Sequence, residues 1–422
     1  MIEAGFLKKL LDKANVEWVP LEKVTLPTSN IKWSDTDRTY QYIDLSSVDR
    51  ETGIISETNE ITRDTAPSRA QKLVQTDDLI FATTRPAQQR FCLISPEWSG
   101  EVASTGYCVL RPDPSKVSPG WLLHWIGSAQ FKTYVEEQQS GSAYPAISDG
   151  KVKAFNVPIP CPENPKKSLA IQGEIVRILD AFTELTAELT AELTARKKQY
   201  NYFRNQLLTF KDGEMDLKAL GQVCEFKNGF AFKSKLFRGE GRPIIRITNV
   251  SGGTIQLDGV KYFNPADYKE NTEAYAISKG DILVAMSGAT TGKIGYYPHE
   301  NTAYLNQRVG KFLPNPDSLN NRYLYHFLLS QNQQIYTLAG GGAQPNLSSN
   351  ALKAKLKIPI PHPDDPKRSL EEQIRIACIL DKMDTLTNSL SEGFPREIAL
   401  RNQQYQYYRD LLLSFAKPEV AT

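Results

Sequence analysis

Two stretches of the chain are nearly the same: VPIPCPENPKKSLAIQGEIVRILD at residues 157–180 and IPIPHPDDPKRSLEEQIRIACILD at residues 358–381. The offset between them is 201 residues, and a second pair, QYNYFRNQLLTF (199–210) and QYQYYRDLLLSF (404–415), repeats at an offset of 205. A period of about 200 residues is too long for a solenoid unit, so the duplicated unit is a whole domain followed by a helix. The order globular, helix, globular, helix predicts a pseudo-twofold arrangement within one chain.

Each repeated stretch begins with a proline-rich connector and continues into a long helix. Residues 158–165 and 359–366 contain too many prolines to be helical throughout, so we expect stiff, extended connectors there, with Ser168 and Ser369 as the N-caps of the helices. The apolar residues that follow are spaced by alternating steps of four and three, which is the pattern of a coiled-coil seam. The predicted seam consists of Ile171, Ile175, Ile178, Phe182, Leu185, Leu189, Leu193, Tyr200, Phe203 and Leu207, and then of Ile376, Ile379, Met383, Leu386, Leu390, Tyr405, Tyr408 and Leu412.

Both helices contain an irregularity. Residues 183–195 (TELTAELTAELTA) repeat the unit TAEL, and the step from Leu189 to Leu193 is a stutter in the seam. One interpretation is a tandem duplication that an exposed helix tolerates. The other is a length adjuster, because each unit adds about 6 Å of helix, which is commensurate with one or two base pairs of DNA. In the second helix, Gly393 and Pro395 predict a kink or a break.

The two blocks that precede the helices are predicted to be mixed α/β domains. Strand-like runs occupy residues 40–45, 78–83 and 106–110, and residues 120–136 have helical spacing. Three segments of the first block recur in the second: TDDLIFA as KGDILVA, GWLLHWI as RYLYHFL, and GSAYPAIS as GGAQPNLS. The predicted organisation is an N-terminal domain (1–157), a central helical spacer (158–212), a second domain (213–357) and a C-terminal helical spacer (358–422).

Charge is distributed unevenly over the 422 residues. The net charge is +2, yet residues 213–357 carry 17 basic and 11 acidic side chains, whereas residues 1–157 carry 17 and 20. If the chain binds nucleic acid, the first domain therefore has to gather its positive charge on one face.

Several kinds of site and location are excluded by the composition. The five cysteines are dispersed without a CxxC pair and there are only four histidines, which indicates a reduced, cytoplasmic protein without a zinc site. No apolar stretch approaches the roughly 18 residues that a membrane span needs. GATTGKI (288–294) differs from a phosphate loop in its spacing and in having Ile294 at the metal-binding position. With no nucleophile elbow or dinucleotide fingerprint either, the sequence predicts a protein that recognises and organises.

The chain closely resembles the specificity subunits of type I restriction-modification enzymes over essentially its whole length. The features that carry the resemblance are the duplicated connector and helix, the TAEL units, and the segments SGATTGKIG and GGAQPNLS. The TAEL units resemble those of the IC subgroup. The resemblance implies an α+β fold in which two α/β target recognition domains are separated by two long antiparallel coiled-coil helices, pseudo-twofold within one chain. It also implies that each domain binds one half of a bipartite double-stranded DNA target and that the helices set the gap.

The same resemblance implies partners. Two copies of a DNA adenine methyltransferase subunit would dock on the helices, and motor/restriction subunits would join them. S-adenosylmethionine and ATP with Mg²⁺ would bind to those partners, while this chain would hold no cofactor or metal and would not itself be an enzyme. The rival interpretations are a self-sufficient DNA methyltransferase or nuclease with duplicated recognition domains, and a purely structural coiled-coil organiser.

Candidate DNA contacts lie in turn-like segments of both blocks. Guanine is read by Arg or Lys and adenine by Asn or Gln, while other basic and hydroxyl groups contact phosphates. In the first block TTRPAQQRF (83–91) replaces the glycine-rich loop, and Tyr144 stands where Gln344 does. For each candidate, a solvated loop residue is the alternative. The candidates are Thr84, Arg85, Gln88, Gln89, Arg90, Thr105 and Tyr144 in the first domain, and Thr290, Thr291, Lys293, Asn306, Gln307, Arg308, Gln344 and Asn346 in the second.

Overall fold

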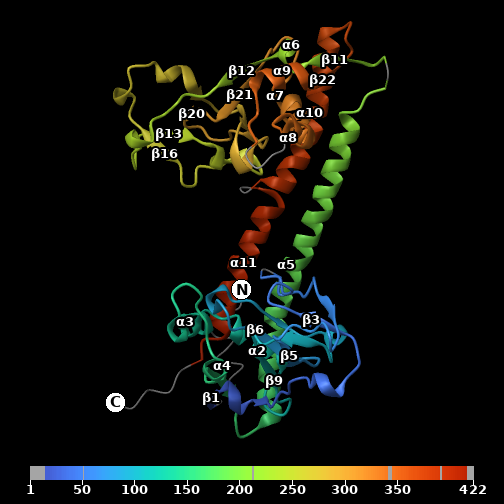
Figure 1. Ribbon diagram of the computed structural model, residues 1–422, viewed down its shortest axis with the longest axis vertical. Coiled ribbons are helices and arrows are strands. Elements are labelled where there is room, and N and C mark those ends of the chain that lie inside the picture. Colours follow the sequence, from blue (N-terminus) through green and yellow to red (C-terminus); the bar gives the residue numbers. More distant parts are fainter. Residues whose placement is uncertain (1–14, 51, 212, 341–344, 390–391, 416–422) are drawn as a thin grey trace. The chain divides into compact units, whose positions relative to one another are not determined.

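The computed structural model describes residues 15–50, 52–211, 213–340, 345–389 and 392–415, and it divides into two compact units (Figure 1). Unit 1 holds the described residues up to Leu189 together with those from Ile398 onward, and unit 2 holds Thr190–Glu397. The longest helix, α5 (Pro165–Leu207, 43 residues), passes from unit 1 into unit 2. Each unit is therefore built from a globular part and from segments of two helices.

Unit 1 contains two four-stranded sheets and a two-stranded ribbon. Strand β6 (Leu79–Ala82) is buried along its whole length, as expected for the short apolar run LIFA. It lies in the sheet β2 (Thr25–Leu26), β9 (Tyr107–Pro112), β6, β7 (Phe91–Leu93). The other sheet is β4 (Asn59–Ile61), β3 (Tyr40–Ile43), β8 (Val102–Ser104), β5 (Ala70–Leu73), and the ribbon pairs β1 (Val16–Pro20) with β10 (Asn156–Pro160). The short helices are α2 (Pro119–Ile126), α3 (Ala129–Gln138) and α4 (Asp149–Lys153).

Unit 2 follows the same plan with a larger main sheet. Its buried strand β18 (Ile282–Ala285, ILVA) is the counterpart of β6. The main sheet runs β12 (Cys224–Asn228), β21 (Val309–Pro314), β18, β19 (Ile294–Tyr296), β15 (Gly253–Ile255), β14 (Val250–Ser251). The remaining strands are β16 (Lys261–Phe263), β13 (Arg242–Ile245), β20 (Ala303–Leu305) and β17 (Ala276–Ile277) in a second sheet, and β11 (Met215–Ala219) with β22 (Lys357–Pro361) in a ribbon. The helices are α6 (Leu220–Val223), α7 (Asn321–Ser330), α8 (Asn332–Leu338), α9 (Ser349–Lys355) and α10 (Pro366–Asn388).

The strand predictions in the first block are confirmed by β3, β6 and β9, but the helix predicted over residues 120–136 is wrong as a single element. Two helices, α2 and α3, meet at Gly127 and Ser128. The Ser128 Oγ accepts a hydrogen bond from the Phe131 N–H (3.1 Å) and donates one to the Trp125 carbonyl (2.7 Å). A serine that caps a new helix is thus hidden inside an apolar pattern that continues across the break.

The proline-rich connectors are shorter than predicted. Their first halves are the strands β10 and β22, which pair antiparallel with β1 and β11. The helices α5 and α10 then begin at Pro165 and Pro366, because proline suits the first helical position, where its missing N–H has no intrahelical partner to lose.

The predicted N-caps, Ser168 and Ser369, are wrong. The Asn164 Oδ1 accepts from the Lys167 N–H at 3.0 Å and the Asp365 Oδ1 from the Arg368 N–H at 3.0 Å, so these residues cap the helices. Ser168 and Ser369 are buried one turn further along.

In each unit one helix leads away from the core and the other returns to it. The core of unit 1 includes Ile175 and Leu179 near the start of α5 and Leu412 at the end of α11 (Gly393–Leu412). Farther from that core, Phe182 stacks on Tyr408 with ring centroids 5.2 Å apart. In unit 2 the final turns of α5 share the core with the first turns of α10. Within each unit the two helices therefore run in opposite directions, and the predicted fold class of two α/β domains with antiparallel long helices is confirmed.

The seam residues differ in exposure. Of the eighteen predicted positions, Leu390 lies outside the described residues, and Leu185 (36%), Phe203 (37%), Ile379 (37%) and Leu386 (41%) are exposed. Leu179, Ala377 and Leu380 are buried although the seam omits them, because the inner face of each helix packs on a domain as well as on the other helix. The buried seam residues are Ile171, Ile175, Tyr200, Ile376, Tyr408 and Leu412, and the half-buried ones are Ile178, Phe182, Leu189, Leu193, Leu207, Met383 and Tyr405.

The predicted break in the second helix is confirmed. Helix α10 ends at Asn388 and α11 begins at Gly393, whose φ of +74° lies in the left-handed region that favours glycine.

Candidate nucleic-acid interface

In unit 2, three of the segments that hold predicted DNA contacts meet around the loop between β18 and β19. The Met286 N–H donates to the Arg308 carbonyl (2.8 Å), and the Met286 carbonyl accepts from the Leu347 N–H (2.7 Å). The Gly288 N–H donates to the Pro345 carbonyl at 3.3 Å. The loop is therefore held between the chain around Arg308 and the chain around Asn346, which brings candidates from three distant parts of the sequence together.

Unit 1 holds its loop in the same way. The Thr83 N–H donates to the Gly106 carbonyl (2.8 Å), the Thr83 carbonyl accepts from the Ile147 N–H (2.9 Å), and the Arg85 N–H donates to the Pro145 carbonyl (2.7 Å). TTRPAQQRF is thus the structural counterpart of the glycine-rich loop, even though the two share little sequence.

The two loops also share their unusual backbone conformations. Arg85 (φ 51°) and Gln89 (φ 49°) have left-handed φ values at the positions where unit 2 has Gly288 (φ 80°) and Gly292 (φ 82°). Such values cost an L-residue free energy but cost glycine almost none. One backbone conformation is therefore built in two ways, with glycines in one unit and with side chains in the other.

The candidate residues differ in how far DNA can reach them. In unit 1, the exposed candidates are Arg85, Gln88 and Tyr144, while Thr84, Gln89, Arg90 and Thr105 are half-buried. In unit 2, the exposed candidates are Lys293, Gln307, Arg308 and Asn346, while Thr290 and Asn306 are half-buried; Gln344 lies outside the described residues.

The side chains of two candidates make hydrogen bonds to backbone carbonyls within their own unit. Thr291 is buried (5% exposed), and its Oγ1 lies 2.6 Å from the Gly288 carbonyl and 3.1 Å from the Pro345 carbonyl. Its hydroxyl therefore holds the loop together. The Arg90 Nη1 donates to the Leu45 carbonyl within unit 1, so this guanidinium is directed at the protein.

Lys293 lies in a positively charged cavity. It lines a cavity of ≈ 360 Å³ together with Lys197 and Arg204 of α5, and Asp384 is the one carboxylate among the described residues that line it. Three cations against one carboxylate suit a phosphate group. The position of Lys293 thus fits a contact to the DNA backbone better than a contact to a base edge.

The globular part of each unit is fastened to its two helices by a histidine that the sequence analysis did not select. The His326 Nε2 lies 2.7 Å from the Asp381 Oδ1 of α10, and its Nδ1 lies 3.0 Å from the Tyr200 hydroxyl of α5. Burial lowers the pKa of His326. Burial by itself would raise the pKa of Asp381, but hydrogen bonds from His326 and Arg322 outweigh it and lower that pKa, which keeps the carboxylate charged.

Unit 1 repeats this cluster. The His124 Nε2 lies 2.8 Å from the Asp180 Oδ1 of α5, and its Nδ1 lies 3.2 Å from the Tyr405 hydroxyl of α11. The recurrence of HWI as HFL within the repeated segments was the available signal for both histidines.

A buried glutamine adds a second fastening in each unit. The Gln172 Oε1 accepts from the Ser118 N–H (3.0 Å) and its Nε2 donates to the Lys116 carbonyl (2.9 Å). The Gln373 Oε1 accepts from the Asn320 N–H (2.8 Å) and its Nε2 donates to the Ser318 carbonyl (3.1 Å). These contacts explain why the sequence around the helix starts is repeated so closely.

The duplicated scaffold corresponds to a known family. The family model described as the type I restriction modification DNA specificity domain matches residues 22–196 and 213–400, which together make up most of the chain. The chain belongs to this family. The specificity subunit of the type I restriction enzyme EcoR124I/EcoR124II from Escherichia coli is 36% identical over 434 residues, covering 100% of both chains. The EcoprrI specificity subunit from Escherichia coli is 31% identical over 410 residues, covering 93% of each.

The fold resembles that of a solved structure. A structure described as the structural basis of complex assembly and conformational transition of the type I R-M system aligns with a TM-score of 0.63 at 22% identity, covering 94% of this chain and 97% of the other. Family membership makes this chain a DNA-recognition subunit and confirms the prediction that it is not itself an enzyme, because specificity subunits are the non-catalytic members of these systems.

The described residues contain no group of three or more His, Cys, Asp or Glu side chains placed to hold a metal ion. No helix within the described ranges is long and apolar enough to span a membrane. The five cysteines are free thiols, and Cys378 alone among them is exposed.

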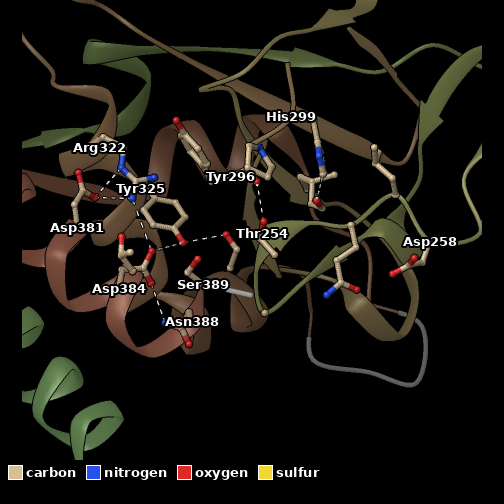
Figure 2. Close-up of a pocket in the computed structure, with 17 residues that line it drawn as sticks. Thr254, Asp258, Tyr296, His299, Arg322, Tyr325, Asp381, Asp384, Asn388 and Ser389 are labelled. Carbon is tan, nitrogen blue, oxygen red and sulfur yellow. Dashed lines mark hydrogen bonds and ion pairs between the residues drawn. The ribbon is translucent and has the colours of Figure 1, made fainter. Parts of the chain in front are cut away.

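A second cavity in unit 2, of ≈ 820 Å³, has the wrong charge for DNA (Figure 2). The Arg322 guanidinium lies between the rings of Tyr296 (4.4 Å) and Tyr325 (4.3 Å) and donates through Nε to the Asp381 Oδ1 at 2.8 Å. Asp258, Asp381 and Asp384 line the same cavity, so its carboxylates outnumber its guanidinium. The loops and not this cavity therefore form the candidate nucleic-acid interface.

Proposed function

We propose that this chain reads a bipartite DNA target for a type I restriction-modification complex, with one half-site bound by residues 1–157 and the other by residues 213–357. The observation that carries the proposal is the common three-segment loop arrangement, which presents Arg85 and Gln88 in unit 1 but Lys293, Arg308 and Asn346 in unit 2. Two readers of the same construction with different side chains recognise two different sequences, so the target is not a palindrome.

The contacts fall into two kinds. Lys293, in its basic cavity, contacts phosphate and fixes the position of the domain on the duplex. The exposed Gln307, Arg308 and Asn346, together with Arg85 and Gln88 in the other domain, carry the functional groups that distinguish base pairs in the major groove.

Residues 158–212 and 358–422 act as the spacer. The boundary between the two units falls at Leu189 and Thr190, inside the TAEL repeats, and the two main cores use α5 only up to Leu179 and from Tyr200 onward. A TAEL unit can therefore be added or removed without disturbing either core. This supports the length-adjuster interpretation over a neutral duplication, and with it membership of the IC subgroup.

Two copies of a DNA adenine methyltransferase subunit dock on the spacer helices, and motor/restriction subunits complete the assembly in the cytoplasm. The support is a pair of exposed aromatic residues at equivalent repeat positions, Tyr202 (58% exposed) and Tyr407 (65% exposed), which offer the same contact twice. S-adenosylmethionine, ATP and Mg²⁺ bind to those partners.

The test is to assemble the chain with its methyltransferase subunits and map methylated adenines in genomic DNA. The proposal predicts one bipartite motif with two unlike halves and a constant gap, absent when this chain is omitted. A contiguous motif, or methylation that does not depend on the chain, would contradict it. Methyl transfer by the purified chain alone would favour the rival, a self-sufficient enzyme.

A further inference from the structure

Arg85 has a backbone conformation that glycine adopts more easily than a residue with a side chain does. Its φ of 51° is left-handed, and the equivalent position in unit 2 is Gly288 with φ 80°. Both loops are closed by a hydrogen bond from this residue to a proline carbonyl, Arg85 to Pro145 and Gly288 to Pro345. Glycine would satisfy the same geometry at lower cost, so the backbone at this position gives no reason for a side chain.

The Arg85 side chain points to solvent and lies against an aromatic ring. Its guanidinium carbon is 5.2 Å from the centroid of the Tyr144 ring, and it makes no ion pair within the described part of the chain. Tyr144 is 71% exposed. The loop that carries it is closed by two hydrogen bonds between the backbones of Ser140 and Ala146, each 2.9 Å long. A cation and a ring from two separate segments thus form an exposed pair on the loop face.

Two neighbouring polar side chains of this loop, Gln89 and Arg90, are less suited to contact a ligand. Gln89, the other residue with a left-handed φ, is half-buried, and its Nε2 is buried without a hydrogen-bond partner among the described residues. Arg90 donates to the Leu45 carbonyl inside the unit. Arg85 is therefore the guanidinium that this loop offers to solvent.

We propose that Arg85, oriented by Tyr144, reads a guanine in the half-site bound by the first domain; the proposal rests on the proposed DNA-reading function. A guanidinium that stacks on a ring keeps its N–H edge free, and that fork matches the O6 and N7 acceptors of guanine in the major groove. Tyr144 is a positioning residue, because its ring holds the guanidinium plane. Gly288 offers no side chain at the equivalent place, so the two half-sites differ at the base pair that faces this position.

The test compares wild-type and Arg85→Gly chains, each assembled in full with the methyltransferase subunits, on duplexes in which every base pair of the mapped target is changed in turn. Arg85→Gly is expected to lose about 5- to 150-fold of discrimination at one G·C pair of the first half-site, the size of one bidentate contact. The second half-site keeps its preferences, and the melting temperature does not fall, because glycine suits the backbone.

Three results would overturn the assignment. One is unchanged discrimination at every position of the first half-site. Another is a uniform loss of affinity with a salt slope lower by about one, which is the behaviour of a phosphate contact. The third is an equal loss of discrimination in Arg63→Gly, a matched control that removes an exposed arginine outside the three loop segments.

Tyr144→Ala tests the positioning role and is expected to weaken discrimination at the same base pair by a smaller factor than Arg85→Gly does. Unchanged discrimination at that base pair in Tyr144→Ala would contradict the proposal that the Tyr144 ring positions Arg85. The assignment and the underlying function can fail separately. If wild-type complexes show no dependence on this chain for the choice of half-sites, the DNA-reading function fails; if they do and Arg85→Gly selects the same bases, only the role of Arg85 fails.

Discussion

The two units repeat the residues that hold their helices and differ in the loop residues that we propose contact DNA. Gln172 and Gln373 make the same pair of backbone contacts, and each of His124 and His326 joins a carboxylate and a tyrosine from the two helices. In the loops only the backbone is repeated: left-handed positions persist while glycine in one unit becomes arginine or glutamine in the other. The two units have thus kept the side chains that join the helices, whereas the side chains of the loops have diverged.

A second difference lies where the short helix that carries the histidine, α2 in unit 1 and α7 in unit 2, packs on the long helix. In unit 1 a Cβ added at Gly120 would lie 2.6 Å from the Val176 Cγ1, so α2 packs closely on α5. In unit 2 Arg322 stands near the equivalent place, between two tyrosines, and lines the acidic cavity. The two fastenings are therefore equivalent in their hydrogen bonds but not in their packing.

The largest expected effect comes from removing a glutamine fastening. Gln373→Leu leaves the half-buried Asn320 N–H and Ser318 carbonyl without their partners, so we expect the free energy of unfolding of unit 2 to fall by about 2 kcal/mol or more. Gln172→Leu is the matched variant in unit 1 and is expected to cost about the same. Urea unfolding followed by circular dichroism measures both. A loss in one variant with none in the other would show that the repeated contacts are not equivalent.

The histidine of unit 2 is expected to have a smaller, pH-dependent effect. The pKa of His326 lies below its ordinary value of 6.5, so the unfolded chain binds the proton more readily than the folded one. The contribution of neutral His326 to the free energy of unfolding is fully present above pH 6.5. It declines as the pH falls below 6.5, by at most about 1.4 kcal/mol per pH unit. His326→Gln should flatten the profile below pH 6.5. An unchanged slope in that variant would assign the pH dependence to other groups.

The smallest effect concerns a pair of equivalent cations. Lys293→Ala should weaken DNA binding a few-fold and lower the salt slope by about one, because we propose that its ammonium contacts phosphate. Arg308→Ala removes a proposed base reader instead, so it is expected to change the preference at one base pair. Arg90→Ala, at the position equivalent to Lys293, should leave the slope unchanged, since its guanidinium serves the Leu45 carbonyl. Binding titrations over a range of salt concentrations measure these slopes, and equal slopes for all variants would contradict the distinction.

The duplication made the domain order, the long helices and their opposite directions predictable. Local details were harder, because several residues compete for the same role. Ser168 and Ser369 are good caps by type, but Asn164 and Asp365 precede a proline that already suits the first helical position. Leu185 and Leu386 fit the seam by spacing and are exposed, because spacing does not reveal where a domain stops covering the helix.

The candidate segments could be named from the sequence, but the contacts that each side chain makes within the protein could not. The two loops could not be matched residue by residue from sequence, because a left-handed arginine at position 85 resembles no glycine pattern. Thr291 has the same chemistry as an exposed threonine, and only its position between two carbonyls identifies it as part of the scaffold. The histidines were overlooked because each is a single polar residue within an apolar helical segment.

In the proposed function, two unlike readers are held apart by a spacer whose length the helices set. Deleting Thr190–Leu193 removes one four-residue TAEL unit, or about 6 Å of helix, from the segment that neither main core uses. Mapping the methylated adenines of the assembled complex should then give both half-sites unchanged and the gap between them shorter by about one or two base pairs. A changed base in either half-site, or an unchanged gap with full methylation, would contradict the account.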